Sequence, residues 1–246
     1  LSSVGDVLQL IGDHNPDIIC LQEFNARLAG QSDEFALLDE KYESAVFGRT
    51  QAPDSLYGAP LVILSKYRIL RSGVVLTPGT SVWADLLIGD DTIRVFNNHL
   101  RSTAIKAADN EYITNRDFIS DTAREVKIRS IVSRLRENSI LRAAQVDSIA
   151  DVIADARARC IVCGDFNDSP LSYSVRKFHS IGFRDAYNEL GLGPGITYHA
   201  NRFWFRIDHI LYKGNMEARW LVRQRHKSSD HYPLVTRFVW ENSENH

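Results

Sequence analysis

The chain has 246 residues, of which 44% are hydrophobic and 24% are charged, so it can bury a sizeable core. Its formal net charge of −2 argues against a strongly basic nucleic-acid binder, although it leaves room for a local basic patch. Since the chain contains no run of about 18 apolar residues, we expect neither a transmembrane helix nor a signal peptide in the sequence as given.

The first 100 residues predict a helix followed by several strands. Apolar side chains from Val4 to Ile11 recur at helical spacing, and Asn15-Pro16 ends the helix. The apolar segment 17–23 predicts a strand directly afterwards, which is the start of an α/β fold. Further strands are predicted at 59–64, 82–88 and 92–98, with a hairpin connection at Gly89-Asp90-Asp91.

The middle of the chain changes character, because residues 90–163 contain no Gly and no Pro. Helical spacing of apolar side chains predicts one helix over 122–137 and another over 139–158, after a polar surface segment at 102–120. Strands resume at 160–163, 206–212 and 233–240. Since no internal repeat, low-complexity tract or linker is present, we expect a single domain over residues 1–246.

The three cysteines, Cys20, Cys160 and Cys163, lie in or beside apolar segments. An odd number of cysteines implies no disulfide framework, and we expect buried free thiols. Cys160 and Cys163 form a C-x-x-C pair, but the alternation of side chains along a strand points the two thiols to opposite faces. A zinc or redox site is therefore not expected at this pair.

Several predicted strands carry polar side chains where they end, and one carries a carboxylate inside it. Each case has an ordinary explanation: a Glu or His at a strand end is often solvated, and Asp165 and Asp168 suit an Asx turn, to which we assign Asp168. An ordinary explanation is hardest to accept for Asp208, because a carboxylate between Ile207 and Ile210 needs a hydrogen-bonding partner. Ordinary explanations for all of these residues together are much less convincing. The residues are Glu23, His99, Asp165, Asn167, Asp208 and His231.

These residues lie in six segments that together resemble the endonuclease/exonuclease/phosphatase superfamily of divalent-metal-dependent phosphoesterases. The segments are PDIICLQE (16–23), YGAPLVILSKYRI (57–69), FNNHLRS (96–102), GDFNDSP (164–170), FRIDHIL (205–211) and SSDHYPL (228–234). They follow the family's order, and the combination of QE, GDFN and SDH at these separations is specific. The resemblance implies a four-layer α/β sandwich of two packed, mixed and mostly antiparallel sheets with outer helices. It places the active site where loops at the strand ends converge.

The resemblance also implies roles for the polar residues. Glu23 is expected to bind Mg²⁺ (or Mn²⁺), since hard cations prefer oxygen ligands. Asp165 is expected to orient or deprotonate the attacking water, and Asn167 to donate a hydrogen bond to a phosphoryl oxygen in the transition state. His231 matches a phosphate-contacting histidine with a general acid or base role, and Asp208 matches the carboxylate that orients its ring. The sequence does not decide whether Asp165 or His231 is the base.

Five further residues complete the expected site. By the resemblance, His99 contacts the scissile phosphate and Asp230 is an acidic residue near the metal. Arg101 and Arg202 are candidates for substrate phosphate contact, because their neighbours in sequence belong to the site. Trp204, in the run Phe-Trp-Phe, is a candidate to stack on a base or an acyl chain, although packing in the core is the commoner role of such a run.

The implied activity is metal-assisted in-line hydrolysis of a phosphodiester or phosphomonoester by water. Nucleic acid, an inositol phosphate and a sphingolipid are the alternative substrates, since the fold alone does not choose among them. The alternative function is a catalytically silent scaffold used for binding, which has no physical need for an unpaired acidic cluster. No protein partner is inferred, and we expect a monomer.

The chain departs from the family's pattern at its beginning. Family members begin with a strand that ends in an Asn near the metal and precedes the first helix, whereas this chain begins at the helix. Asn15 lies after the helix and cannot substitute for that residue. We therefore expect the first strand to lie upstream of residue 1. Localisation is not predicted, because a signal or membrane anchor would lie in the same upstream segment.

Overall fold

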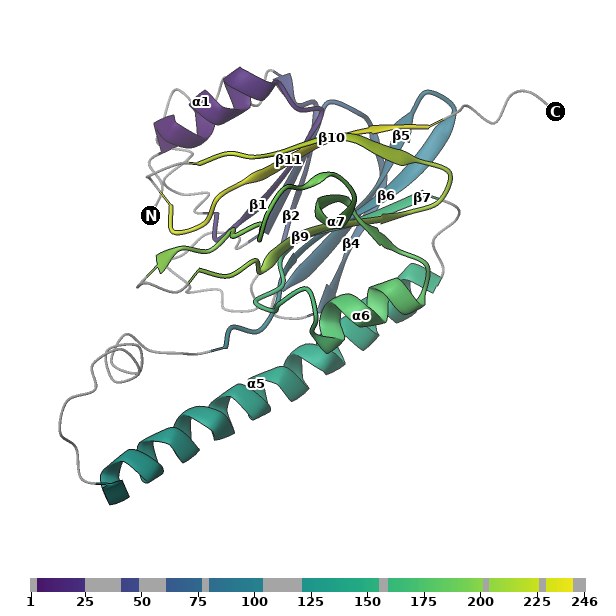
Figure 1. Ribbon diagram of the computed structural model, residues 1–246. Coiled ribbons are helices and arrows are strands. Elements are labelled where there is room, and N and C mark those ends of the chain that lie inside the picture. Colours follow the sequence, from purple (N-terminus) through teal and green to yellow (C-terminus); the bar gives the residue numbers. More distant parts are fainter. Residues whose placement is uncertain are drawn as a thin grey trace, which may run out of the picture.

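Two β-sheets lie face to face between helices, so the chain is built in four layers (Figure 1). The structure is a computed structural model that describes residues 4–24, 41–48, 61–76, 80–103, 121–154, 159–200, 204–225 and 229–240. The expected sandwich of mixed, mostly antiparallel sheets with outer helices is confirmed. Within these ranges, no helix combines the length and the apolar character that crossing a membrane requires.

The larger sheet has six strands in the order β4-β5-β6-β7-β9-β8. The β6–β7 pair is parallel, whereas the other neighbouring pairs are antiparallel. The strands are β4 (Ile69–Leu76), β5 (Ser81–Ile88), β6 (Asp91–His99), β7 (Arg159–Asp165), β8 (Arg184–Asp185) and β9 (Asp208–Lys213). A parallel pair needs a long crossover connection, and the crossover from β6 to β7 contains helix α5 (Asp121–Ala154).

The smaller sheet has three antiparallel strands in the order β1-β3-β2. They are β1 (Ile18–Gln22), β2 (Ser44–Phe47) and β3 (Leu61–Ser65). The central strand β3 is buried along its whole length, which explains its continuous apolar sequence. Strands β10 (Glu217–Arg223) and β11 (Leu234–Val239) form a separate antiparallel pair, whose Leu221 and Phe238 pack against the core between the sheets.

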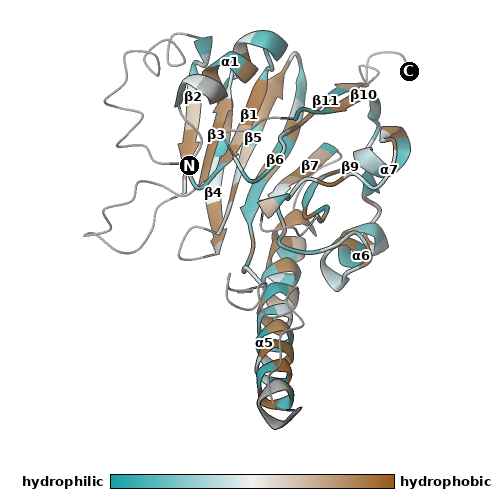
Figure 2. Cartoon of the chain, turned by 60° about the vertical axis from the view of Figure 1, so that its left-hand side comes forward, coloured by the Kyte–Doolittle hydropathy of each residue, from teal (hydrophilic) through white to brown (hydrophobic). Residues whose placement is uncertain are grey.

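Three apolar clusters hold the layers together, and the strands that contribute to them are mostly hydrophobic (Figure 2). The first joins the two sheets and includes Leu61 of β3 and Val95 of β6. The second joins the six-stranded sheet to α5 and α6 (Tyr173–Ser180), with Ile149 and Val162 among its members. The third packs Ile11 of α1 (Val4–His14) on the smaller sheet. Each sheet is thus covered on both faces.

Most of the predicted elements are present, but two of the predictions need correction. The helices predicted over 122–137 and 139–158 are one continuous helix, α5. Asn138 lies between the two predicted ranges, but its Nδ2 donates to the carbonyl of Arg134 one turn earlier and the helix continues through it. The strand predicted over 206–212 begins at Asp208, so this carboxylate starts β9 and does not interrupt a strand. Residues 104–120, most of the predicted surface segment, lie outside the described residues.

Other elements were not predicted from the sequence. Short or edge strands and short helices lack the long apolar patterns on which the predictions relied. These elements are β2, β4, β8, β10, α6 and α7 (Ala186–Leu190). The prediction for the cysteines is confirmed in part: all three are free thiols, but only Cys160 is buried, in the cluster beneath α5 and α6, whereas Cys20 and Cys163 are half-buried against the core between the sheets.

The backbone at Gly164 gives the first testable prediction. Its φ is +122°, and a Cβ added there would lie 2.1 Å from the carbonyl oxygen of Asn98 on the paired strand β6. We expect Gly164→Ala to lower the free energy of unfolding by about 2 kcal/mol or more, because the clash of the new Cβ with the Asn98 carbonyl can be relieved only if β6 and β7 separate. Denaturant unfolding measures this change.

Gly12 in α1 supplies the matched control, since a Cβ added there meets nothing within 4 Å. Gly12→Ala should be neutral or stabilise the protein by up to about 1 kcal/mol. Equal effects of the two substitutions would contradict the steric explanation.

Candidate active site

The six-stranded sheet brings three of the predicted residues side by side. His99 at the end of β6 pairs with Asp165 at the end of β7, and Asp165 pairs with Asp208 at the start of β9. Since β6 and β7 are parallel and β9 runs antiparallel to them, two strand ends and one strand start meet at the same edge. His231 reaches this edge from the segment before β11, where it bridges to Tyr198.

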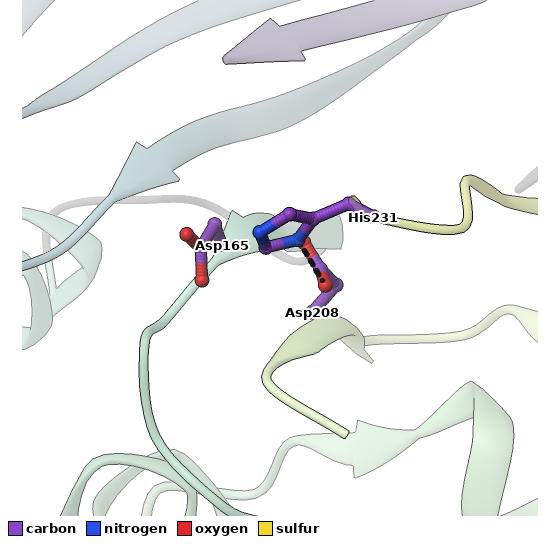
Figure 3. A group of neighbouring side chains, drawn as sticks. All are labelled: Asp165, Asp208 and His231. Atoms are coloured by element: carbon purple, nitrogen blue, oxygen red, sulfur yellow. Dashed lines mark hydrogen bonds and ion pairs between the residues drawn. The ribbon is translucent and has the colours of Figure 1, made fainter. Parts of the chain in front are cut away.

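His231 and Asp208 form the central pair of the site. The Nδ1 atom of His231 lies 2.8 Å from Oδ2 of Asp208, and the ring lies between the carboxyl groups of Asp208 and Asp165 (Figure 3). The backbone N–H of Asp208 donates to Oγ1 of Thr197 at 3.1 Å. The Tyr198 ring packs edge-on against the His231 ring, with centroids 5.0 Å apart. Asp208 therefore has the partner that its apolar surroundings require.

The negative charges around His231 keep it protonated. Burial opposes the charged ring and lowers the pKa of His231, but the hydrogen bond to Asp208 and the charges of Asp208, Asp165 and Asp230 outweigh burial and raise it to about 9. At neutral pH the imidazolium donates its Nδ1–H to Asp208. Its second N–H remains on the side of the ring that faces Asp165 (Figure 3).

Asp165 is 6% exposed, and both of its oxygens accept hydrogen bonds from Asn167. The donors are the backbone N–H of Asn167 at 2.7 Å and its side-chain amide at 2.8 Å. Burial and the neighbouring charge of Asp208 raise the pKa of Asp165 to about 7, although His231 and the Asn167 N–H act in the opposite direction. A carboxyl group with a pKa near neutrality is suited to proton transfer.

Asn167 joins the ends of β6 and β7. Its φ of 51° lies in the left-handed region, which Asn tolerates better than most residues. The side-chain amide donates to Asp165 and also to the carbonyl of Leu100 at 3.2 Å. The amide that we expected to contact a phosphoryl oxygen is thus held by protein acceptors, and its contact with substrate stays a prediction.

Glu23 and His99 close the opposite side of the site. The Nε2 atom of His99 lies 3.7 Å from Oε1 of Glu23 and 3.6 Å from Oδ2 of Asp165. Burial lowers the pKa of His99, and the charge of His231 lowers it further, which outweighs the opposing effects of Glu23 and Asp208. His99 is therefore neutral at pH 7, and these short distances are not ion pairs. The Glu23 carboxylate itself is 76% exposed, directly after β1.

The carboxylates of the site fit a hard divalent cation. Ligand atoms of Asp165, Asp208 and His231 lie within 4.8 Å of one another, but Asp208 and His231 use two of these atoms in their own hydrogen bond. Glu23 offers an exposed carboxylate, and Mg²⁺ is commonly held by one or two carboxylates, waters and substrate oxygens. Asp230 is exposed, and its backbone carbonyl accepts a hydrogen bond from His199 at 2.9 Å. A direct contact of Asp230 with metal stays a prediction.

The three predicted substrate-binding residues have different positions. Arg101 lies just beyond the site, where its Nε donates to Oδ1 of Asn138 on α5 at 2.8 Å. Trp204 is 68% exposed and the adjacent Phe205 is exposed too, so core packing, the commoner role for this run, is wrong for both rings. The Phe205 backbone pairs with Tyr198, which contacts His231. Arg202 lies outside the described residues.

The sequence did not predict the contacts that fix the site from behind. Asn97 is fully buried between the sheets, where its Nδ2 donates to the carbonyls of Leu21 and Val62 and its Oδ1 accepts from Gln22 at 2.6 Å. It ties β6 to the strand that carries Glu23. The available signal was an Asn within an apolar strand, which by itself indicates a partner but not its identity.

Comparison with known proteins gives one family and a set of similar folds. The model of the Endonuclease/Exonuclease/phosphatase family matches residues 2–231. No curated protein sequence matches the chain. A family protein from Bacteroides thetaiotaomicron is 15% identical with a TM-score of 0.68, covering 96% of this chain and 88% of that chain.

Two further solved structures cover nearly the same part of the chain. The human Nocturnin catalytic domain is 18% identical with a TM-score of 0.64, covering 96% of this chain and 85% of that chain. Truncated TDP2 from Caenorhabditis elegans is 17% identical with a TM-score of 0.62, covering 96% and 88%. Identities this low show a shared fold only.

The pairing of His231 with Asp208 gives the second prediction. In the metal-free protein, Asp208→Asn should return the pKa of His231 from about 9 to 6.5 or below, because burial then acts with less opposition. The pKa of His231 is higher in the folded than in the unfolded protein. Protonated His231 therefore makes its full contribution to the free energy of unfolding below about pH 6.5, and this contribution is lost as the pH rises through about 9. NMR titration of the ring and unfolding at several pH values measure both effects.

The matched control is Asp147→Asn, which removes a carboxylate that bonds Tyr173 and Lys177 on the surface and should leave the His231 titration unchanged. A His231 ring that titrates near 6.5 in the wild-type protein would contradict the assignment.

Proposed function

Because the chain belongs to the endonuclease/exonuclease/phosphatase family, we propose that it is a divalent-metal-dependent hydrolase of phosphodiesters or phosphomonoesters. Members of this family are generally hydrolases of phosphoester bonds and typically depend on divalent metal. The observation that carries the proposal is the pairing of His231 with Asp208 beside a buried Asp165. A scaffold used only for binding has no physical need to hold these groups together.

Asp165 and His231 have pKa values suited to opposite roles. With a pKa of about 7, Asp165 is substantially deprotonated at neutral pH and can accept the proton of an attacking water. With a pKa of about 9, His231 is protonated and can stabilise a phosphoryl oxygen or donate to the leaving oxygen. Environments that separate the pKa values of two neighbouring groups are typical of an acid and a base. We therefore assign Asp165 as the base.

The other residues of the site orient these two groups or contact substrate. Asn167 holds the Asp165 carboxylate through two hydrogen bonds, which directs it toward the water. The neutral His99 contacts the scissile phosphate, and Arg101 contributes positive charge at the margin. The exposed ring of Trp204 stacks on a planar or apolar part of the substrate.

Glu23 is the residue that would hold Mg²⁺ or Mn²⁺, with Asp230 as a second carboxylate nearby. When bound, the cation neutralises charge on the phosphoryl oxygens. Around the site, Glu23, Asp165, Asp208 and Asp230 outnumber the charged His231, so the site has an acidic excess that favours a cation.

The third prediction tests hydrolysis. The full chain with Mg²⁺ or Mn²⁺ should hydrolyse bis-p-nitrophenyl phosphate, and Asp165→Asn and His231→Ala should each lower kcat/KM by about 10²–10⁴-fold, since each removes a proton-transfer group. Asp147→Asn on the surface of α5 is the control and should retain activity. An inactive wild-type chain would favour the silent scaffold, and undiminished activity in both site variants would contradict the roles of Asp165 and His231.

The same assay, applied to nicked DNA, inositol phosphates and sphingomyelin, separates the three substrate classes by their kcat/KM values. Comparing kcat/KM for a phosphomonoester with kcat/KM for the corresponding phosphodiester shows which type of ester the protein prefers. Trp204→Ala should lower kcat/KM most for a substrate with a base or an acyl chain beside the phosphate, because that ring is exposed and its neighbour Phe205 pairs with Tyr198, which contacts His231.

The fourth prediction concerns the metal. Glu23→Gln should weaken Mn²⁺ binding about tenfold or more, because it removes one of the two exposed carboxylates of the proposed metal site. Calorimetry or electron paramagnetic resonance of Mn²⁺ without substrate measures the affinity. Glu43→Gln, a matched change at an exposed glutamate before β2, should bind Mn²⁺ as the wild type does. Unchanged binding by Glu23→Gln would remove Glu23 from the proposed metal site.

A further inference from the structure

We propose that Arg142 of α5 is a positioning residue of the active site, which locks the segments after β6 and β7 together and thereby fixes His99 relative to Asp165. This inference rests on the proposed phosphoesterase function. Among the described residues, Arg142 makes its polar contacts with Arg101 and Asp168 and not with Asp165 or His231, so it acts through the two segments that it holds.

The guanidinium of Arg142 contacts both segments. Although charged, Arg142 is only 3% exposed. Its Nη1 donates to the backbone carbonyl of Arg101 at 2.8 Å, shortly after His99 in the chain. Its Nε lies 3.3 Å from Oδ2 of Asp168, shortly after Asp165. A single buried group therefore spans the two strand ends that form the site edge.

Asp168 is anchored more firmly than a turn residue requires. Its Oδ2 accepts a hydrogen bond from Oγ of Ser174 on α6 at 2.7 Å. Its backbone carbonyl lies 3.0 Å from Nε2 of His209 on β9, next to Asp208. The assignment of Asp168 to the turn is thus incomplete, because its carboxylate connects the segment after β7 to α5 and α6, and its backbone carbonyl connects this segment to β9. Arg142 supplies the positive charge in this arrangement.

Two neighbours of Arg142 on the same face of α5 hold the segment after β6. Oε1 of Gln145 accepts the backbone N–H of Arg101 at 2.9 Å, and Oδ1 of Asn138 accepts from its side chain. Asn138, Arg142 and Gln145 lie three or four residues apart, so they project from one side of the helix. Of these three, Arg142 is the residue that also reaches Asp168.

The segments after β6 and β7 are also hydrogen-bonded to each other directly, next to Asp165. The Leu100 N–H donates to the Asp165 carbonyl at 2.9 Å, and Asn167 donates to the Leu100 carbonyl. A shift of either segment therefore moves the Asp165 carboxylate and the amide that orients it. Loss of Arg142 would leave the Asp168 carboxylate, whose side chain is 16% exposed, without its counter-charge. A displacement of about 1 Å can lower catalysis by about 10²-fold.

The fifth prediction compares Arg142→Met, Arg142→Lys and Asp168→Asn with the wild-type chain. We expect Arg142→Met to lower kcat by about 10- to 100-fold while KM and Mn²⁺ affinity stay within about threefold, because the groups that bind substrate and metal remain. Arg142→Lys should recover part of the kcat, since it keeps the charge but not both contacts. All kinetics are measured well below the melting temperature of each variant, so that unfolding does not lower kcat.

A double variant tests whether Arg142 acts through Asp168. If it does, Arg142→Met combined with Asp168→Asn should lose little more kcat than the worse single variant. Arg129→Met is the matched control, because Arg129 is exposed on the same helix and pairs with Glu125 there. It should leave kcat unchanged.

The outcomes separate this inference from the proposed function. A wild-type chain that hydrolyses the ester, with Arg142→Met at wild-type kcat or with fully multiplicative losses in the double variant, overturns the positioning role and leaves the function standing. A wild-type chain without hydrolysis overturns both. If Arg142→Met does not fold, Arg142→Lys and Asp168→Asn decide: wild-type kcat in both overturns the role, and reduced kcat at unchanged KM supports it.

Discussion

The parallel pairing of β6 with β7 is the constraint on which the site depends. Gly164 lies so close to the Asn98 carbonyl that a side chain cannot fit, which fixes the spacing of the two strands one residue before the site. This pairing sets His99 opposite Asp165, and the antiparallel neighbour β9 adds Asp208. The reactive groups thus stand on paired backbone, which holds them more firmly than flexible loops would.

The same closeness couples the charges of the site. Burial and the charge of Asp208 raise the pKa of Asp165, and the surrounding carboxylates raise the pKa of His231 although burial opposes this. Burial and, to a smaller extent, the positive charge of His231 lower the pKa of His99, so His99 stays neutral. The substrate-free site therefore contains an imidazolium, a neutral imidazole and a carboxyl group near its midpoint. A bound cation would shift all three, since it would be the largest local charge.

The sequence predicted those parts of the site that have strong local signals. A carboxylate at the start of an apolar strand needs a partner, and the family's motifs identified His231 as that partner of Asp208. Arg142 carries no such signal, and Asn97 within an apolar strand indicates a partner but not its identity. The acceptors of both residues include backbone carbonyls far away in the chain, which any residue can provide. The continuity of α5 was missed for a related reason: Asn138 resembles a helix end locally, but its tertiary contacts with Arg101 keep it inside the helix.

The unpredicted anchors explain how a site assembled from two sheets and a helix stays aligned. Asn97 joins β6 to the β1 end that carries Glu23, and Arg142 joins the ends of β6 and β7 from the helical side. Both reach backbone atoms, so the alignment depends little on the side chains that face the substrate. The exposed rings of Trp204 and Phe205 lie outside this framework. If Trp204 contacts substrate as proposed, its substitution should change substrate preference while Asn97 and Arg142 keep the site aligned.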